Sequence, residues 1–242
     1  MSELSRLFDD RRFPLQLRLD VADVICGIRP AARVIFRLGL EADAGVRLLH
    51  DCGLALAVGS GFREQVEPVG CGYVDSFSDR LSESRVIRVI PIYVARGLEL
   101  ARAAKQADES QSDAEFGRSL GYPSCCVDAV IKRRQVPMLS ECFSLYAPGG
   151  EYSPWLWPGA LALDAPLSPH FPCSAVCNAS AVMARARWDS VLASGNDTIA
   201  DRLVAARQAV YWLTSDGIVR TGAALPEDEQ VLSLACPGTR FP

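Results

Sequence analysis

The chain has 242 residues, of which 49% are hydrophobic and 22% charged, and its formal net charge at pH 7 is -4. This length suffices for one large domain or two small ones, with a core that needs no disulfide staples. The composition is that of an ordinary globular protein without the basic excess that nucleic-acid phosphates require, so we expect no nucleic-acid partner.

Residues 1–17 contain acidic side chains and lack the apolar run of a secretory signal. No segment approaches the roughly 18 consecutive apolar residues of a membrane helix. We therefore expect a cytoplasmic protein with no membrane partner. In a reducing compartment its nine cysteines favour metal or redox chemistry over structural disulfides.

The first half of the chain carries the patterns of both strands and helices. Apolar residues alternate with other residues over 15–21, which predicts a half-buried strand. Residues 44–53 predict a short helix that Gly53 ends, and residues 54–58 predict a strand after it. The expected fold class is therefore α/β in the mixed, α+β sense.

A second strand and helix follow further along the chain. Residues 85–95 are rich in β-branched side chains and predict a buried strand, which Pro91 either bends or places near a sheet edge. Residues 97–107 predict a helix.

A polar break at residues 108–114 is the candidate hinge between two units. The predicted division is an α/β unit over 1–110 and a helix-rich cysteine-motif region over 111–242. Near the end, two β-prone runs flank Asp216-Gly217, a dipeptide favoured in tight turns, and predict a C-terminal β-hairpin.

The motif GYPSCC, residues 121–126, places two cysteines side by side behind a proline. Proline is favoured at the first position of a helix, because its missing N–H costs nothing there. Pro123 therefore predicts a helix start with Cys125 and Cys126 in the initial turn.

A second motif, HFPCSAVCNAS at residues 170–180, has the same design. Pro172 predicts a longer helix with Cys173 in its initial turn and Cys177 one turn later on the same face. Helix N-termini stabilise thiolates through their free N–H groups and positive dipole ends. If the two predicted helices meet at their N-termini, the four sulfurs converge.

Four convergent thiolates are the ligand set of a 4Fe-4S or 2Fe-2S cluster, and equally of a structural zinc. Adjacent cysteines strain the ligand spacing that zinc prefers, whereas a wider cluster accepts ligands from more divergent directions. An iron-sulfur cluster, 4Fe-4S first, is the expected cofactor, with zinc as the alternative. The expected ligands are Cys125, Cys126, Cys173 and Cys177.

His170 lies three residues before Cys173, where ligation, proton transfer and a structural bond each fit. We predict that it lies behind the ligands and serves in catalysis. Ser180 continues the face of Cys173 and Cys177, and it is expected either to hydrogen-bond a sulfur or to face the core. It also stands where the third cysteine of a radical S-adenosylmethionine C-x3-C-x2-C motif would be, which argues against that activity.

The remaining cysteines are expected to be structural. An isolated cysteine usually packs as a small hydrophobe, and this is the prediction for Cys26, Cys52, Cys71 and Cys236, with Cys142 as a candidate fifth thiol. Trp155 and Trp157 lie in a proline- and glycine-rich loop and either form an aromatic wall beside the metal or cap a hydrophobic core. Further candidates for substrate binding or acid-base chemistry are Arg118, Asp128 and Glu151.

Both motifs resemble the signatures of a known family. GRSLGYPSCCVDAV, residues 117–130, resembles GYP-x-CC, and HFPCSAVCNAS resembles H-x-PCS-x2-C, in an uncharacterised cysteine-rich group of bacterial and archaeal proteins. The similarity extends over about residues 86–185. The resemblance is compatible with metal binding and implies no particular fold or reaction.

These patterns lead to one functional hypothesis and two alternatives. The first is a cytoplasmic iron-sulfur enzyme, a lyase or sulfurtransferase, that acts on a small-molecule substrate by non-radical Lewis-acid or sulfur-transfer chemistry. The second is a zinc-stabilised binding module, in which the metal only joins the two halves. The third is a thiol/disulfide redox protein.

Overall fold

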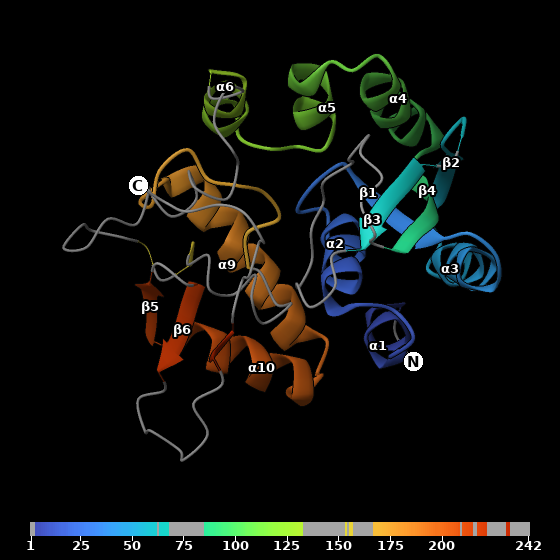
Figure 1. Cartoon of the computed structure of the whole chain (residues 1–242). Helices are drawn as coiled ribbons and strands as arrows, with labels where there is room; N and C mark the ends of the chain where they lie inside the picture. Colours follow the sequence, from blue (N-terminus) through green and yellow to red (C-terminus); the bar gives the residue numbers. More distant parts are fainter. Residues whose placement is uncertain are drawn as a thin grey trace.

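The structure is a computed structural model, and it has the expected mixed α+β fold (Figure 1). An antiparallel sheet with covering helices forms from the first half of the chain, and helices that carry the cysteine motifs follow it, with a small second sheet. The residues that it describes are 3–61, 63–67, 85–132, 153, 155–156, 167–208, 210–214, 217–221 and 231–232.

The first sheet is built around β4 (Arg85–Ala95), which confirms the strand predicted there. Antiparallel β1 (Ala31–Arg37) pairs with one side of β4, and β2 (Ala55–Val58) and β3 (Arg63–Glu67) share the other side. The edge placement of Pro91 is wrong, because β4 is central. The Pro91 carbonyl accepts a hydrogen bond of 2.9 Å from the Gly59 N–H. The backbone N–H that proline lacks would therefore point to the break between β2 and β3, where no ladder hydrogen bond is lost.

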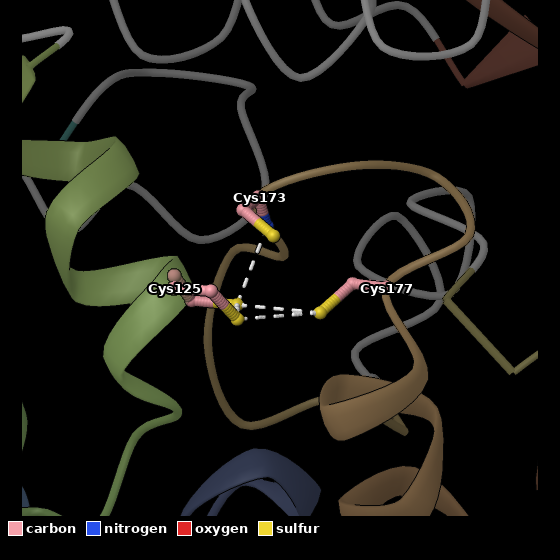
Figure 2. A group of neighbouring side chains, drawn as sticks. Cys125, Cys173 and Cys177 are labelled. Carbon is pink, nitrogen blue, oxygen red and sulfur yellow. Dashed lines mark hydrogen bonds between the residues drawn. The ribbon is translucent and has the colours of Figure 1, made fainter.

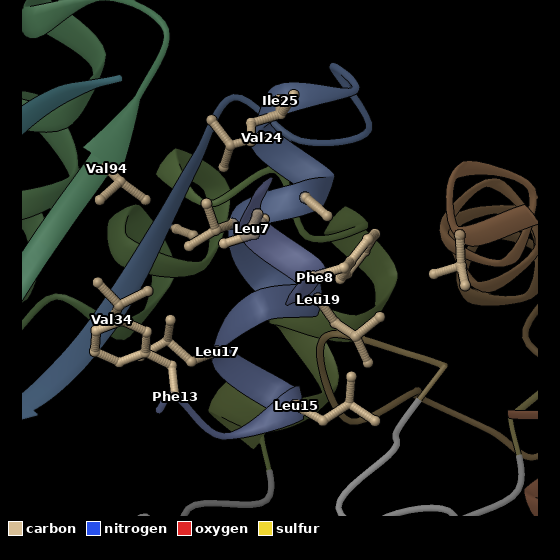
Figure 3. Close-up of a cluster of buried hydrophobic side chains, with 14 of the residues drawn as sticks. Leu7, Phe8, Phe13, Leu15, Leu17, Leu19, Val24, Ile25, Val34 and Val94 are labelled. Atoms are coloured by element: carbon tan, nitrogen blue, oxygen red, sulfur yellow. The ribbon is translucent and has the colours of Figure 1, made fainter. Parts of the chain in front are cut away.

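The strand predicted at residues 15–21 is wrong, because this segment is part of helix α2 (Leu15–Ile25). Its apolar residues alternate, but they also recur at the i, i+4 spacing of a helix, as Leu15 and Leu19 do. Ala22 and Val24 are buried as well, so the helix is covered on several sides. It therefore has no polar face that would distinguish the period of a helix from the period of a strand. α2 packs against β1 and α1 (Glu3–Asp9), where the buried side chains of Figure 3 meet.

The predicted helices at residues 44–53 and 97–107 are confirmed as α3 (Leu40–Asp51) and α4 (Leu98–Glu109). Gly53, two residues beyond α3, has a φ of 67°, which favours glycine. A short turn after α4 leads into α5 (Asp113–Ser119), which packs against it.

α6 (Ser124–Lys132) begins directly after Pro123, as predicted. The second helix does not begin at Pro172, because α9 (Asn178–Ala193) starts six residues later with Cys177 as its N-cap. The intervening backbone bonds elsewhere: the Ala175 carbonyl accepts from the Ser153 N–H at 2.8 Å, so it cannot serve a helical turn. Cys173 is therefore a loop residue.

After α9 come α10 (Asp197–Gln208) and the strands β5 (Val210–Thr214), β6 (Gly217–Thr221) and β7 (Val231–Leu232). β5 and β6 pair antiparallel, with Thr214 opposite Gly217, which confirms the hairpin. Several predictions lie outside the described residues, namely those for Cys71, Cys142, Cys236, Trp157 and Glu151.

One buried cluster of apolar side chains runs from α1 and α2 through the first sheet to α9 and α10. A buried ion pair between Asp23 of α2 and Arg187 of α9 also joins the two predicted units. The division into 1–110 and 111–242 stays a prediction. None of the helices in the described ranges is long and apolar enough to cross a membrane.

Candidate metal centre

The sulfurs of Cys125, Cys126, Cys173 and Cys177 all lie within 4.8 Å of one another, which confirms the predicted convergence. Cys125 Sγ is 3.9 Å from Cys126 Sγ and 3.8 Å from Cys177 Sγ, and the last two sulfurs are 3.7 Å apart. Figure 2 shows the side chains of Cys125, Cys173 and Cys177 pointing toward one another, from α6 and from the segment that leads into α9. We call this group of four cysteines the thiol cluster.

The GYP sequence positions the first cysteine pair. Gly121 has a φ of 77°, and a Cβ there would overlap the ring of Pro30, so glycine fits both the turn and the close approach. Pro123 then caps the helix, because its carbonyl accepts hydrogen bonds from the N–H groups of Cys126 at 2.9 Å and Val127 at 3.0 Å. This geometry puts Cys125 and Cys126 in the first turn of α6.

The second motif positions its cysteines by a loop followed by a helix start. The Cys173 N–H donates a hydrogen bond of 3.3 Å to Cys126 Sγ, which ties the loop to α6. Cys177 is the N-cap of α9, and its carbonyl accepts from the Ala181 N–H at 3.0 Å. The two motifs therefore meet, as predicted. Cys125, Cys126 and Cys177 lie at helix starts, whereas Cys173 lies in the loop between them.

Ser180 contacts two sulfurs from the first turn of α9, where its side chain is fully buried. Its Oγ lies 3.2 Å from Cys126 Sγ and 3.3 Å from Cys177 Sγ. The predicted alternative of a hydrogen bond to sulfur is confirmed. The same hydroxyl lies 2.8 Å from His170 Nε2, so it connects His170 to the thiol cluster.

His170 lies behind the sulfurs and stacks on Tyr122, with ring centroids 4.9 Å apart. Burial disfavours its charged form, and the nearby Arg29 and Arg187 add to the effect, so the pKa of His170 falls to about 4. The imidazole is thus neutral at pH 7. Its predicted catalytic role stays a prediction.

The sulfurs differ in how easily they ionise. Desolvation opposes ionisation of Cys177, but hydrogen bonds from Ser180 and from the thiols of Cys173 and Cys126 outweigh it and lower its pKa to about 7. Desolvation raises the pKa of Cys126 and, with less burial, that of Cys173. Without a metal, therefore, Cys177 ionises before Cys126 and Cys173.

Burial also distinguishes the four cysteines. Cys126 is 2% exposed and Cys177 is 7% exposed, whereas Cys173 is partly exposed and Cys125 is exposed. The cluster is therefore buried at Cys126 and Cys177 and open at Cys125.

The thiol cluster suits a thiophilic metal. All four donors are soft sulfurs, the ligand type that zinc and iron-sulfur centres use. Zinc–sulfur bonds of about 2.3 Å place the ligands of a tetrahedral ion roughly 3.8 Å apart. The three separations among Cys125, Cys126 and Cys177, at 3.7 to 3.9 Å, match that spacing, and Cys173 Sγ lies within 4.8 Å of the other sulfurs.

Beside the thiol cluster lies a buried ionic network that the sequence patterns did not reveal. Arg187 is fully buried and donates hydrogen bonds to Asp23, at 3.0 and 3.1 Å from its Nε, and to Asp20 at 2.7 Å. Arg29 approaches the same two carboxylates at 2.9 and 3.4 Å. Its Nη1 also lies 3.5 Å from the Tyr122 hydroxyl, which links the network to the GYP motif. No sequence spacing signals pairs that stand more than 160 positions apart.

Two other cysteines test the expectation of structural thiols. Cys52 is buried, as predicted. Cys26 is exposed, so its prediction as a buried hydrophobe is wrong; it is the C-cap of α2, where the helix reaches the surface.

The other candidate residues make aromatic and ion-pair contacts that are common in folded proteins. Trp155 packs against the core cluster and meets Trp188 edge-on at 6.4 Å, as the core-capping alternative predicts. Arg118 and Asp128 are exposed and lie 3.9 Å apart as an ion pair. Their predicted roles in substrate chemistry stay predictions.

Comparisons with models of known protein families, with curated proteins and with solved structures found no match.

Proposed function

We propose that this protein binds one thiophilic ion, zinc, through Cys125, Cys126, Cys173 and Cys177. The observation that carries the proposal is the spacing of the sulfurs, because three of the separations lie at 3.7 to 3.9 Å. That spacing suits ligands of one tetrahedral ion, for which about 3.8 Å follows from the zinc–sulfur bond length.

The same spacing bears on the choice between zinc and a cluster. A 4Fe-4S cluster takes its four cysteines on four different irons, so its ligand sulfurs stand farther apart than those of a single ion. Although the two cysteines are adjacent in sequence, the sulfurs of Cys125 and Cys126 lie 3.9 Å apart in the first turn of α6, a separation that one zinc ion accepts. This supports the zinc alternative over the iron-sulfur prediction.

An ion in this position would join segments that are distant in sequence. Cys125 and Cys126 come from α6, while Cys173 and Cys177 come from the loop and N-cap of α9. Four-thiolate zinc sites contribute directly to folding, since the binding free energy is available only when the ligands are brought together. Ser180 and His170 would orient the sulfurs from behind, as groups outside the ligand shell commonly do.

Metal analysis tests the proposal. Protein purified anaerobically is analysed for zinc, iron and acid-labile sulfide, and its visible absorption is recorded. We expect about one zinc per chain and a colourless protein. Cys126→Ser should lose the metal, whereas Cys52→Ser, at an equally buried cysteine outside the cluster, should retain it.

The iron-sulfur enzyme remains the second candidate, and one observation favours it. Cys125 is exposed and Cys173 is partly exposed, while Cys126 and Cys177 are buried, so a metal held here has a side that a small molecule could approach. Iron with stoichiometric sulfide and a brown colour would establish this candidate and overturn zinc. Absence of both metals after reconstitution with each would overturn both candidates.

A further inference from the structure

We propose that Cys125 is the reactive thiolate of this centre, a nucleophile toward small, soft carbon electrophiles that donate an alkyl group. The inference rests on the proposed function, because a bound zinc is what would keep Cys125 deprotonated. It names a substrate class for the same site.

Exposure selects Cys125 among the four ligands. Cys126 and Cys177 are 2% and 7% exposed, so an electrophile cannot approach their sulfurs without opening the fold, and Cys173 is only partly exposed. Cys125 is exposed at the first turn of α6. A reagent in solution therefore meets Cys125 first.

Hydrogen bonding selects the same residue. N–H and O–H groups that donate to a thiolate stabilise its charge and so reduce its reactivity. Cys126 receives the Cys173 N–H, and Cys177 receives the Ser180 hydroxyl. Cys125 lies near the sulfurs of Cys126 and Cys177, and within the described ranges no N–H or hydroxyl donates to it.

Charge narrows the class of electrophile. Four thiolates around one divalent zinc carry a net charge of about -2. Asp128, three residues after Cys125 on α6, pairs with Arg118 at 3.9 Å, so this ion pair leaves the negative charge of the centre unchanged. The site should therefore favour neutral or cationic alkyl donors over anionic ones.

The chemical step balances without a redox partner. A lone pair of Cys125 Sγ forms the sulfur–carbon bond, and the bond from carbon to the leaving group breaks, with its electron pair going to the leaving group. The thiolate becomes a neutral thioether, a weaker ligand, so the centre loses one negative charge and binds its metal less tightly.

Alkylation of the zinc-loaded protein with limiting iodoacetamide at pH 6.5 tests the inference. Modified peptides are quantified by mass spectrometry, and Cys26, an exposed thiol outside the cluster, is the internal comparator. We expect Cys125 to react about tenfold faster than Cys26, because few ordinary thiols are ionised at this pH. The preference for Cys125 should shrink with anionic iodoacetate, and the alkylated protein should lose zinc to a chelator more readily.

Two further measurements separate this inference from the proposed function. Zinc content is determined in every sample, and Cys125→Ser is alkylated in parallel and should lose the fast reaction. Full zinc occupancy with Cys125 no faster than Cys26, or with another ligand modified first, would overturn the inference and leave zinc binding intact. A protein that binds no zinc would overturn the proposed function itself.

Discussion

Ser180 has three polar neighbours but a single hydroxyl proton, so it can donate to one sulfur and must accept from His170. Nδ1 of His170 is buried and has no hydrogen-bond partner among the described residues. The proton is therefore assigned to Nε2, where it can bond to Ser180 Oγ. This arrangement leaves the Ser180 hydroxyl proton free for Cys177 or Cys126.

Ser180→Ala should weaken zinc binding about 10- to 100-fold, because it removes the group that orients two ligand sulfurs. Ser190→Ala is the matched control: Ser190 is also buried on α9, but it donates to the Arg187 carbonyl at 2.7 Å, outside the thiol cluster. Chelator competition measures the zinc affinity of both variants. Equal affinities would contradict the orienting role of Ser180.

Cys52 provides a pH-dependent contribution to stability away from the metal. Burial, with a smaller effect of Glu3, raises the pKa of Cys52 from 9.0 to about 11. Between these values the folded protein keeps a proton that the unfolded chain releases. The protonated Cys52 thiol thus stabilises the fold fully below pH 9, and this contribution disappears as the pH rises to 11. The free energy of unfolding then falls by at most about 2–3 kcal/mol.

Urea unfolding of the wild type and Cys52→Ala from pH 8 to pH 11 checks this expectation. Other groups that titrate in this range are common to both proteins, so the difference between their curves isolates Cys52. The wild type should lose more stability with rising pH than the variant. Parallel curves would show that the Cys52 thiol is not protected by burial.

At the scale of elements, Gly121 determines where α6 begins, because it combines a φ of 77° with close contact to Pro30. Gly121→Ala should destabilise the protein by about 2–4 kcal/mol, from backbone strain and overpacking together. Gly195→Ala is a matched control, since Gly195 has a φ of 68° but open space at the Cβ position, and it should cost only about 1 kcal/mol.

Denaturant unfolding with zinc analysis of both variants measures these costs. The zinc affinity should fall in Gly121→Ala, because α6 would shift with Cys125 and Cys126. If both glycine variants lost the same stability and kept full zinc affinity, the close contact between Gly121 and Pro30 would not be what positions α6.

Local patterns predicted elements well where one period was distinctive. The β-branched run gave β4 with its observed bounds, and Gly53 marked the end of α3. Residues 15–21 were predicted wrongly because a segment buried on several sides satisfies both periods at once. The start of α9 was missed because Pro172 permits a helix start, while long-range bonds of the following loop decided against it.

At the scale of the whole molecule, the sequence predicted the convergence of four thiols from two uncommon motifs. It did not predict how far apart they stand, which depends on the loop that brings Cys173 N–H to Cys126. It also missed the ionic network of Arg187, since single Asp and Arg residues carry no signature in sequence. Such pairs are selected by three-dimensional packing, here of α9 on α2.

Arg187→Met should cost about 3–5 kcal/mol of stability, because among the described residues the fully buried Asp23 carboxylate would keep Arg29 alone as a nearby cation. Adding Asp23→Asn should recover part of the loss, since the uncompensated charge is then removed. Arg185→Met on the same helix is the control: Arg185 is exposed and stacks on Trp155, so its loss should cost less than about 1 kcal/mol.

Urea unfolding of the two arginine variants, Asp23→Asn and the double variant measures these terms, and zinc affinity is determined in parallel. Because Arg187 fixes α9 against α2, and Cys177 caps α9, the Arg187→Met protein should also bind zinc more weakly than Arg185→Met. Equal stabilities for the two arginine variants would show that the buried pair does not hold α9. Unchanged zinc affinity in a destabilised Arg187→Met protein would show that the thiol cluster assembles independently of the helix on which it borders.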